Sequence, residues 1–144
     1  MRLKLGLIFT LAVCTSSLLG CTIASKQTSI EISCDDFAKH PHVNNEIQVA
    51  VGSTITVTLC SNPTTGFQWM EAQISDQTVL EETSHEFIPP SEADGPPPPG
   101  SAGKDVWTFK ALKKGTGTIS VEYSRPWEGG EKGERTFRLD VTVK

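Results

Sequence analysis

Apolar and polar residues alternate over most of the chain that follows residue 46. Within each run the apolar residues share one side, in the segments Ile47–Val51, Ile55–Leu59, Phe67–Trp69, Trp107–Ala111, Ile119–Tyr123 and Phe137–Val143. A period of two is typical of strands with one buried and one solvated face. The abundance of Thr and Val in these runs favours the same structure. The pattern therefore predicts a β-sheet protein.

Turn-forming residues separate these runs. Lys113–Gly115 and Glu128–Gly133 each lie between two runs, and no long segment repeats with the helical period. One short helical turn is expected near Cys34–His40, with Asp35 as its cap. About seven strands without a helical crossover predict an all-β, immunoglobulin-like antiparallel sandwich. A small barrel is the alternative.

The connection from Ile88 to Lys104 is long and consists mainly of Pro, Gly, Ser, Ala and acidic residues. Its prolyl run Pro96–Pro99 is stiff and cannot donate hydrogen bonds to a sheet. Connections of this length inside a compact domain are usually functional or disordered. The run could instead be a polyproline ligand for another module, although it is short and lacks flanking basic residues.

The N-terminus has the pattern of a secretory signal peptide. Arg2 and Lys4 accompany the mostly apolar stretch Leu5–Val13, which is too short to span a membrane. The tetrapeptide Leu18–Cys21 resembles the bacterial lipoprotein box, and this resemblance implies cleavage before Cys21 and lipidation of that cysteine. The alternative is an ordinary signal peptide that happens to contain a cysteine.

These features predict three segments. Residues 1–20 would be the signal peptide, residues 21–29 a lipid-anchor tether, and residues 30–144 the folded domain. The protein would be exported and anchored to a membrane, facing the periplasm or the cell exterior. The formal net charge of −4 and the absence of a basic run argue against a nucleic-acid partner.

Two cysteines remain in the expected mature domain, because Cys14 leaves with the signal peptide and Cys21 is the expected lipid site. In an exported protein we expect Cys34 and Cys60 to form a disulfide. The alternative is a catalytic cysteine, which would need a partnered base that neither neighbourhood supplies.

Asn62–Gly66 is the most conspicuous turn in the chain. Asn62 can bond to its own downstream backbone, Pro63 fixes φ, and Gly66 permits a positive φ. Thr64 and Thr65 would then stand at the tip of a preorganised protrusion, which loses little entropy when it binds. Taken alone, the segment could equally be an ordinary connection.

Two later connections have matching positions at the ends of predicted strands. One contains Gly100, Ser101, Ala102 and Gly103, and the other contains Arg125, Pro126 and Trp127. An exposed Trp beside an Arg is a frequent binding anchor. The alternative is that Trp127 folds back over the edge of the sheet.

Together these motifs resemble the chagasin-type inhibitors of papain-like cysteine peptidases. The family combines Asn-Pro-Thr-Thr-Gly-aromatic-x-Trp, a glycine-rich loop and Arg-Pro-Trp, and the corresponding segments here are Asn62–Trp69, Gly100–Gly103 and Arg125–Trp127. The resemblance runs from about Ile47 to the C-terminus. One departure is Ala102, which stands where the family usually has glycine. Alanine tolerates a positive φ poorly, so the loop backbone is expected to differ here or the glycine to be only loosely required.

The resemblance implies an immunoglobulin-like, monomeric inhibitor that is not an enzyme and needs no cofactor. The three loops would form a wedge, with Asn62–Gly66 entering the peptidase cleft and the other two loops gripping its sides. Thr64 and Thr65 would make the central contact and Trp127 the apolar anchor. Phe67 and Trp69 would pack inward as scaffold.

Two other functions are possible from the residues alone. The first is a surface lipoprotein module that binds another protein or a glycan, because a sandwich fold does not fix function. The second is an enzyme or metal protein that uses the histidines His40, His42 and His85. No ligand spacing supports a metal site, so we expect none.

Overall fold

The computed structural model describes residues 26–92 and 95–144. The predicted signal peptide, Cys21 and residues 22–25 lie outside the described residues. Within the described part, no helix is long and apolar enough to cross a membrane. The elements in chain order are β1 (Gln27–Ile32), α1 (Cys34–Lys39), β2 (His42–Val49), β3 (Thr54–Ser61), a 3-10 turn (Pro63–Thr65), β4 (Gln68–Trp69), β5 (Gln73–Ile74), β6 (Leu80–Ile88), β7 (Gly103–Ala111), β8 (Gly115–Ser124) and β9 (Arg135–Val143).

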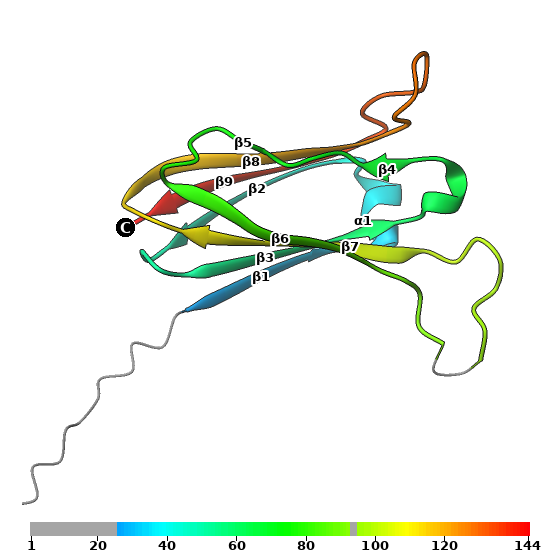
Figure 1. The fold of residues 1–144 in the computed structure, drawn as a ribbon, viewed down its shortest axis with the longest axis horizontal. Coiled ribbons are helices and arrows are strands. Elements are labelled where there is room, and N and C mark those ends of the chain that lie inside the picture. Colours follow the sequence, from blue (N-terminus) through cyan, green and yellow to red (C-terminus); the bar gives the residue numbers. More distant parts are fainter. Residues whose placement is uncertain (1–25, 93–94) are drawn as a thin grey trace, which may run out of the picture.

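Two sheets pack face to face, and the predicted all-β sandwich is confirmed (Figure 1). One sheet has the order β1-β3-β7-β6, and the other has the order β2-β9-β8-β4, with β5 also paired to β8. Apolar residues on alternate positions fill the space between the sheets. Its large fully buried side chains include Trp107, Tyr123, Phe37, Phe109, Phe137, Ile55, Leu59 and Leu139.

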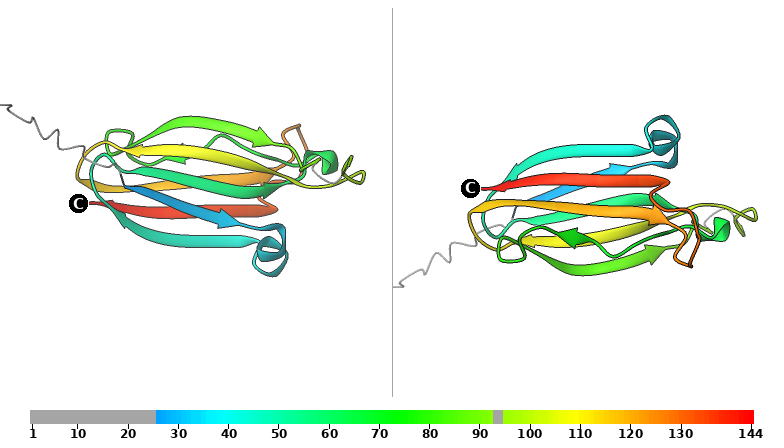
Figure 2. Two further views of the ribbon diagram at one scale, coloured as in Figure 1. Left: turned by 90° about the horizontal axis from the view of Figure 1, so that it is seen from below. Right: turned by 90° about the horizontal axis from the view of Figure 1, so that it is seen from above.

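Two edge pairings depart from the predicted antiparallel arrangement. β1 runs parallel to β3, and β2 runs parallel to β9. The reason is α1, which carries the chain from the first sheet to the second, so that β1 and β2 each add to an edge of a different sheet (Figure 2). Residues 27–29, assigned above to the tether, form the start of β1.

Two local predictions also need correction. The N-cap of α1 is Ser33 and not Asp35, because the Ser33 hydroxyl accepts the backbone N–H of Asp36 while the Asp36 carboxylate accepts the backbone N–H of Ser33. Such a reciprocal capping box satisfies two helix-end donors. Val51, placed above in a strand, follows the end of β2 and is 46 % exposed.

The expected disulfide between Cys34 and Cys60 is present and joins α1 to the end of β3. On the inner side of α1, the ring of Phe37 packs 5.4 Å from the ring of Trp69. Helix α1 therefore closes the sandwich at the end where β3 and β4 meet.

The connections β3–β4, β6–β7 and β8–β9 all leave this same end of the sandwich, whereas β1 begins and the chain ends at the opposite end (Figures 1 and 2). This follows from the strand directions, since β3, β6 and β8 all run toward the loop end. The fold thus brings together the three segments that carry the sequence motifs.

Candidate functional site

Loop 62–66 is held by its first residue. The Asn62 side-chain oxygen accepts the Thr64 backbone N–H at 3.3 Å and the Thr64 hydroxyl at 2.6 Å. The Thr65 hydroxyl donates to the Asn62 carbonyl at 2.7 Å. Gly66 ends the turn with φ +80°, a conformation that favours glycine. Pro63, Thr64 and Thr65 are exposed on this rigid turn.

Asn62 also joins its loop to two other parts of the protein. Its backbone N–H donates to the hydroxyl of Tyr123 in β8 at 2.8 Å, and its side-chain amide donates to the Gly100 carbonyl at 2.8 Å. Sequence reasoning placed Tyr123 only in the core. Its hydroxyl is the polar end of a 2 % exposed side chain, and it orients the start of the loop.

The β6–β7 connection ends in a tight turn. The Ser101 backbone N–H donates to the Pro98 carbonyl at 3.1 Å, and Gly100 has φ +82°. Pro at the second and Gly at the third position suit a type II turn. No described residue other than glycine has a positive φ, so Ala102 is free of the strain expected for alanine there.

Gly103 occupies a different position from its neighbours in this motif. It is buried at the start of β7, where a Cβ atom would lie 2.3 Å from the Ile88 carbonyl oxygen and 2.7 Å from Cζ of Phe87. A side chain has no room there, so Gly103 allows β6 and β7 to approach at the base of the loop.

The third loop packs against the first. A Cβ atom on Gly66 would lie 2.8 Å from the Trp127 ring, and the Arg125 guanidinium lies 4.3 Å from the centre of the Phe67 ring and 5.9 Å from that of Trp127. Trp127 is nevertheless 52 % exposed. It is therefore seated beside Gly66 with half of its surface available to a partner, and it does not fold back over the sheet edge.

The aromatic residues that follow loop 62–66 pack inward, as predicted. Phe67 is 6 % exposed and stacks on Tyr123 with ring centres 5.5 Å apart. Trp69 is 5 % exposed and donates from its indole nitrogen to the Cys60 carbonyl at 3.0 Å. They anchor the loop in the core.

Lys132 is a further supporting residue, which no pattern in the sequence predicts. Its ammonium donates to the carbonyls of Arg125 and Trp127. The backbone N–H of Arg125 also donates to the Glu131 carbonyl at 2.8 Å, which closes the base of this loop. The anchor Trp127 is thus carried on a loop that is bonded internally.

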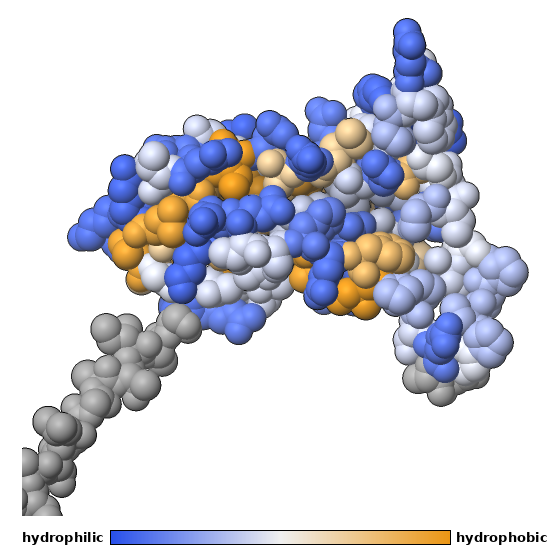
Figure 3. Space-filling model, viewed as in Figure 1, coloured by the Kyte–Doolittle hydropathy of each residue, from blue (hydrophilic) through white to orange (hydrophobic). Residues whose placement is uncertain are grey.

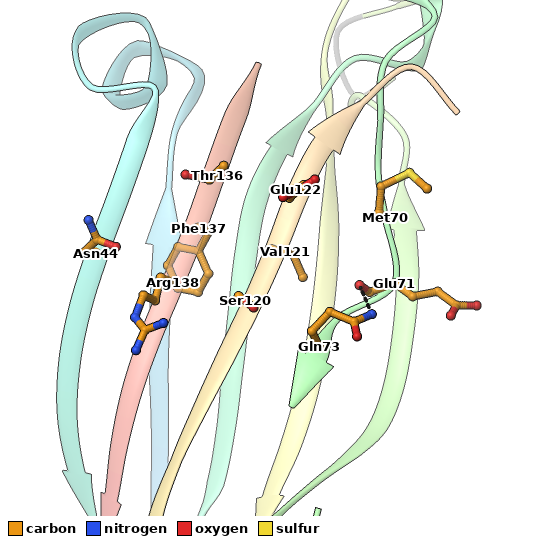
Figure 4. Close-up of a pocket in the computed structure, with 10 residues that line it drawn as sticks. All are labelled: Asn44, Met70, Glu71, Gln73, Ser120, Val121, Glu122, Thr136, Phe137 and Arg138. Atoms are coloured by element: carbon orange, nitrogen blue, oxygen red, sulfur yellow. Dashed lines mark hydrogen bonds between the residues drawn. The ribbon is translucent and has the colours of Figure 1, made fainter. Parts of the chain in front are cut away.

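The structure also has a depression that lies away from the three motif loops. A depression of about 520 Å³ on the outer face of the second sheet is lined mainly by polar side chains, among them Asn44, Gln73, Glu122 and Arg138 (Figure 4). None of the three motifs contributes to it. Within residues 26–92 and 95–144, no three His, Cys, Asp or Glu side chains converge as a metal site.

Comparison with known proteins places this loop arrangement in a family. The sequence pattern described as chagasin family peptidase inhibitor I42 matches residues 48–141. Amoebiasin-2 of Entamoeba histolytica is 30 % identical over 99 residues, which cover 68 % of this chain and 76 % of that protein.

Solved structures agree in fold. The cysteine protease inhibitor EhICP2 from Entamoeba histolytica superposes with a TM-score of 0.59 at 21 % identity, over 82 % of this chain and 97 % of that one. PbICP-C, solved in complex with falcipain-2, superposes with a TM-score of 0.51 at 17 % identity, over 83 % of this chain and 91 % of that one. The matched region contains all three motif loops, and the chain belongs to the chagasin family of peptidase inhibitors.

Proposed function

We propose that this protein is a reversible inhibitor of papain-like cysteine peptidases and that it inserts its three loops as a wedge into the active-site cleft. The observation that carries the proposal is the coupling of the loops. Asn62 bonds to Gly100, and Trp127 packs beside Gly66, so the loops form one preorganised surface. Family membership supports the class of target, since its members are peptidase inhibitors and PbICP-C was solved with falcipain-2.

Thr64 and Thr65 make the central contact in this proposal. Both are exposed at the tip, and both hydroxyls are already bonded to Asn62, so little freedom remains to be lost on binding. Inhibition then requires no chemistry. The wedge blocks substrate, and it resists cleavage if no carbonyl reaches attack geometry at the peptidase cysteine.

The flanking loops grip the sides of the cleft. Gly100, Ser101 and Ala102 provide one side, and Pro126 and Trp127 provide the other, with Trp127 as the apolar anchor. Asn62, Pro63 and Gly66 shape the wedge, while Arg125 and Gly103 support it from behind. An interface of standard size, about 1,600 Å² in total, would include all three loops.

Titration against papain tests the proposal. Hydrolysis of a small peptide substrate should fall as the protein is added. The Thr64→Ala/Thr65→Ala double variant should inhibit at least tenfold more weakly, which is roughly the loss in affinity expected when one or two buried contacts are removed. Thr116→Ala is the matched control, because Thr116 is exposed near the opposite end of β8. No inhibition at micromolar protein would reject the proposal.

We further propose that the protein is exported and carries a lipid on Cys21. The sequence pattern of residues 1–21 supports this, and β1 begins at the end of the sandwich away from the loops. An anchor there would leave the wedge directed away from the membrane. Mass analysis of the mature protein should find the chain beginning at Cys21 with added acyl mass, and Cys21→Ala should lack it. An unmodified N-terminus would reject the anchor while leaving the inhibitor proposal intact.

A further inference from the structure

A depression of about 330 Å³ opens beside loop 62–66, between β4 and β6. Its lining includes Pro63, Gln68, Trp69, His85, Phe87 and Asp105. Because Pro63 belongs both to the wedge and to this wall, the depression is continuous with the proposed peptidase-binding surface. Of the residues that the family motifs identify, only Pro63 and Trp69 line this depression among the described residues.

The depression exists because the end of β6 has no strand facing it. His85 pairs with Trp107 and Phe87 pairs with Asp105 in the β6–β7 ladder, so each pair shares a sheet face. Trp107 and Asp105 are buried, whereas only Leu80 is buried in all of β6. The opposite sheet ends here in β4, which is only two residues long. Inward-facing residues of β6 therefore remain open to solvent.

Acidic and aromatic groups meet in this depression. Asp105 is 8 % exposed, and the Nε2 atom of His85 lies 2.6 Å from its Oδ1 atom. Since an ionised carboxylate only accepts hydrogen bonds, the imidazole donates. The His85 ring is fixed in turn by stacking on Trp107, with ring centres 4.2 Å apart. Among the described residues, no group donates to the other carboxylate oxygen of Asp105.

The walls suit an aliphatic stem or a flat cation. Phe87 is 43 % exposed and its neighbour Ile88 is 44 % exposed. Apolar surface is visible near the ends of β6 and β7 (Figure 3). Pro63 also lines the depression, and no Lys or Arg of the part of the chain that the structure describes does so. An arginine side chain combines a three-carbon stem, a planar cation that stacks on aromatic rings, and donors suited to a carboxylate.

We propose that this depression receives an arginine side chain from the rim of the target peptidase, with its guanidinium on Asp105 and its stem against Phe87. The inference rests on the proposed function and adds a determinant of selectivity to it. Peptidases with arginine at the facing rim position would be inhibited most tightly. Those with an acidic residue there would be disfavoured by repulsion from Asp105.

The depression can be tested without a peptidase. N-acetyl-arginine N-methylamide, titrated to millimolar concentrations, should shift the NMR signals of the His85 ring in a saturable way. The uncharged N-acetyl-norleucine N-methylamide, which keeps an aliphatic stem but lacks the guanidinium, should not, and Asp105→Asn should abolish the response to the arginine compound. Equal shifts with the norleucine compound, or no shift with either, would overturn the proposal.

A second test uses inhibition of papain, cathepsin B and cathepsin L. Asp105→Asn and Phe87→Ala should each weaken inhibition of at least one of them by about tenfold, and the Asp105 effect should shrink at high salt. Glu46→Gln is the control, because it removes the same negative charge at an exposed position of β2. Phe87→Ala keeps the test valid if Asp105→Asn misfolds, because Phe87 is partly exposed and its replacement should leave the fold intact.

The two proposals fail in different ways. If the unaltered protein inhibits but both variants match it within twofold on all three peptidases, the arginine site is wrong and the wedge stands. If the unaltered protein inhibits none of them, the proposed function is wrong, and the arginine site as a peptidase contact is wrong with it.

Discussion

The side-chain amide of Asn62 donates to the backbone carbonyl of Gly100 over 2.8 Å, between residues 38 positions apart. The oxygen of the same amide accepts two hydrogen bonds from Thr64. One planar group therefore shapes the first loop and fixes the second loop beside it. A primary amide carries its donor and its acceptor on separate atoms, whereas aspartate, which has nearly the same shape, keeps only the acceptor when ionised.

Asn62→Asp separates these two functions. The aspartate keeps the acceptor for Thr64 but loses the donor to Gly100 and sets a negative charge against that carbonyl. We expect about 1–2 kcal/mol lower stability and faster dissociation from papain, with little change in association. Denaturant unfolding and surface plasmon resonance measure the two effects. An unchanged dissociation rate would mean that the link between the loops does not contribute to binding.

Gly66→Ala tests the contact between the first and third loops. Alanine at φ +80° is strained, and its Cβ would lie 2.8 Å from the Trp127 ring, which must move. Gly129→Ala is the matched control, since Gly129 has φ +72° but no atom within 4 Å of the new Cβ. Both variants should lose about 1 kcal/mol of stability from backbone strain.

Only Gly66→Ala should also weaken inhibition, because it alone displaces the anchor. Removing the ring in a Gly66→Ala/Trp127→Ala double variant should then cost no more affinity than Trp127→Ala alone. Fully additive losses in the double-mutant cycle would show that the two residues act independently.

The sequence predicted the sandwich because the central strands have one buried face. It did not predict β6, in which all residues after Leu80 are exposed. Because nearly all of this strand is exposed, it lacks the alternation of apolar and polar residues on which the prediction depends. Strand β1 was hidden for a related reason, since it lies at a sheet edge and its alternate residues are only half-buried.

The motifs predicted which loops would meet but not how they are joined. The bonds from Asn62 to Tyr123 and Gly100 and from Lys132 to the third loop connect residues far apart in sequence or depend on backbone carbonyls. A linear pattern records residue types and carries no information on such contacts. The same holds for the depression at Asp105, which depends on the register between β6 and β7.

The capping box of α1 gives a pH-dependent contribution to stability. The hydroxyl and then the backbone N–H of Ser33 hold the pKa of Asp36 below its ordinary value of 3.8. A pKa lowered in the folded state means that the contribution is complete above the unfolded pKa and is lost as the pH falls through the folded value. Asp36→Ala should therefore be less stable than the unaltered protein at pH 7.

That stability difference should shrink as the pH falls from 3.8 through the lower folded pKa of Asp36, below which the carboxylate is protonated in both states. Asp35→Ala removes the same charge from the neighbouring exposed position outside the capping box. Urea unfolding at several pH values measures the difference. A gap that stays constant into strong acid would exclude the ionised carboxylate as its source.

The disulfide between Cys34 and Cys60 should stabilise the domain and the wedge together. It links positions 26 residues apart, and loss of this constraint on the unfolded chain costs about 3 kcal/mol. Cys60 also precedes Asn62 closely, and its carbonyl accepts the Trp69 indole. We expect Cys34→Ser/Cys60→Ser to unfold at lower denaturant and to dissociate from papain faster. The unaltered protein in a strong reductant should match the double variant, whereas insensitivity to complete reduction would show that packing of Phe37 on Trp69 is sufficient to hold α1 against the loop end.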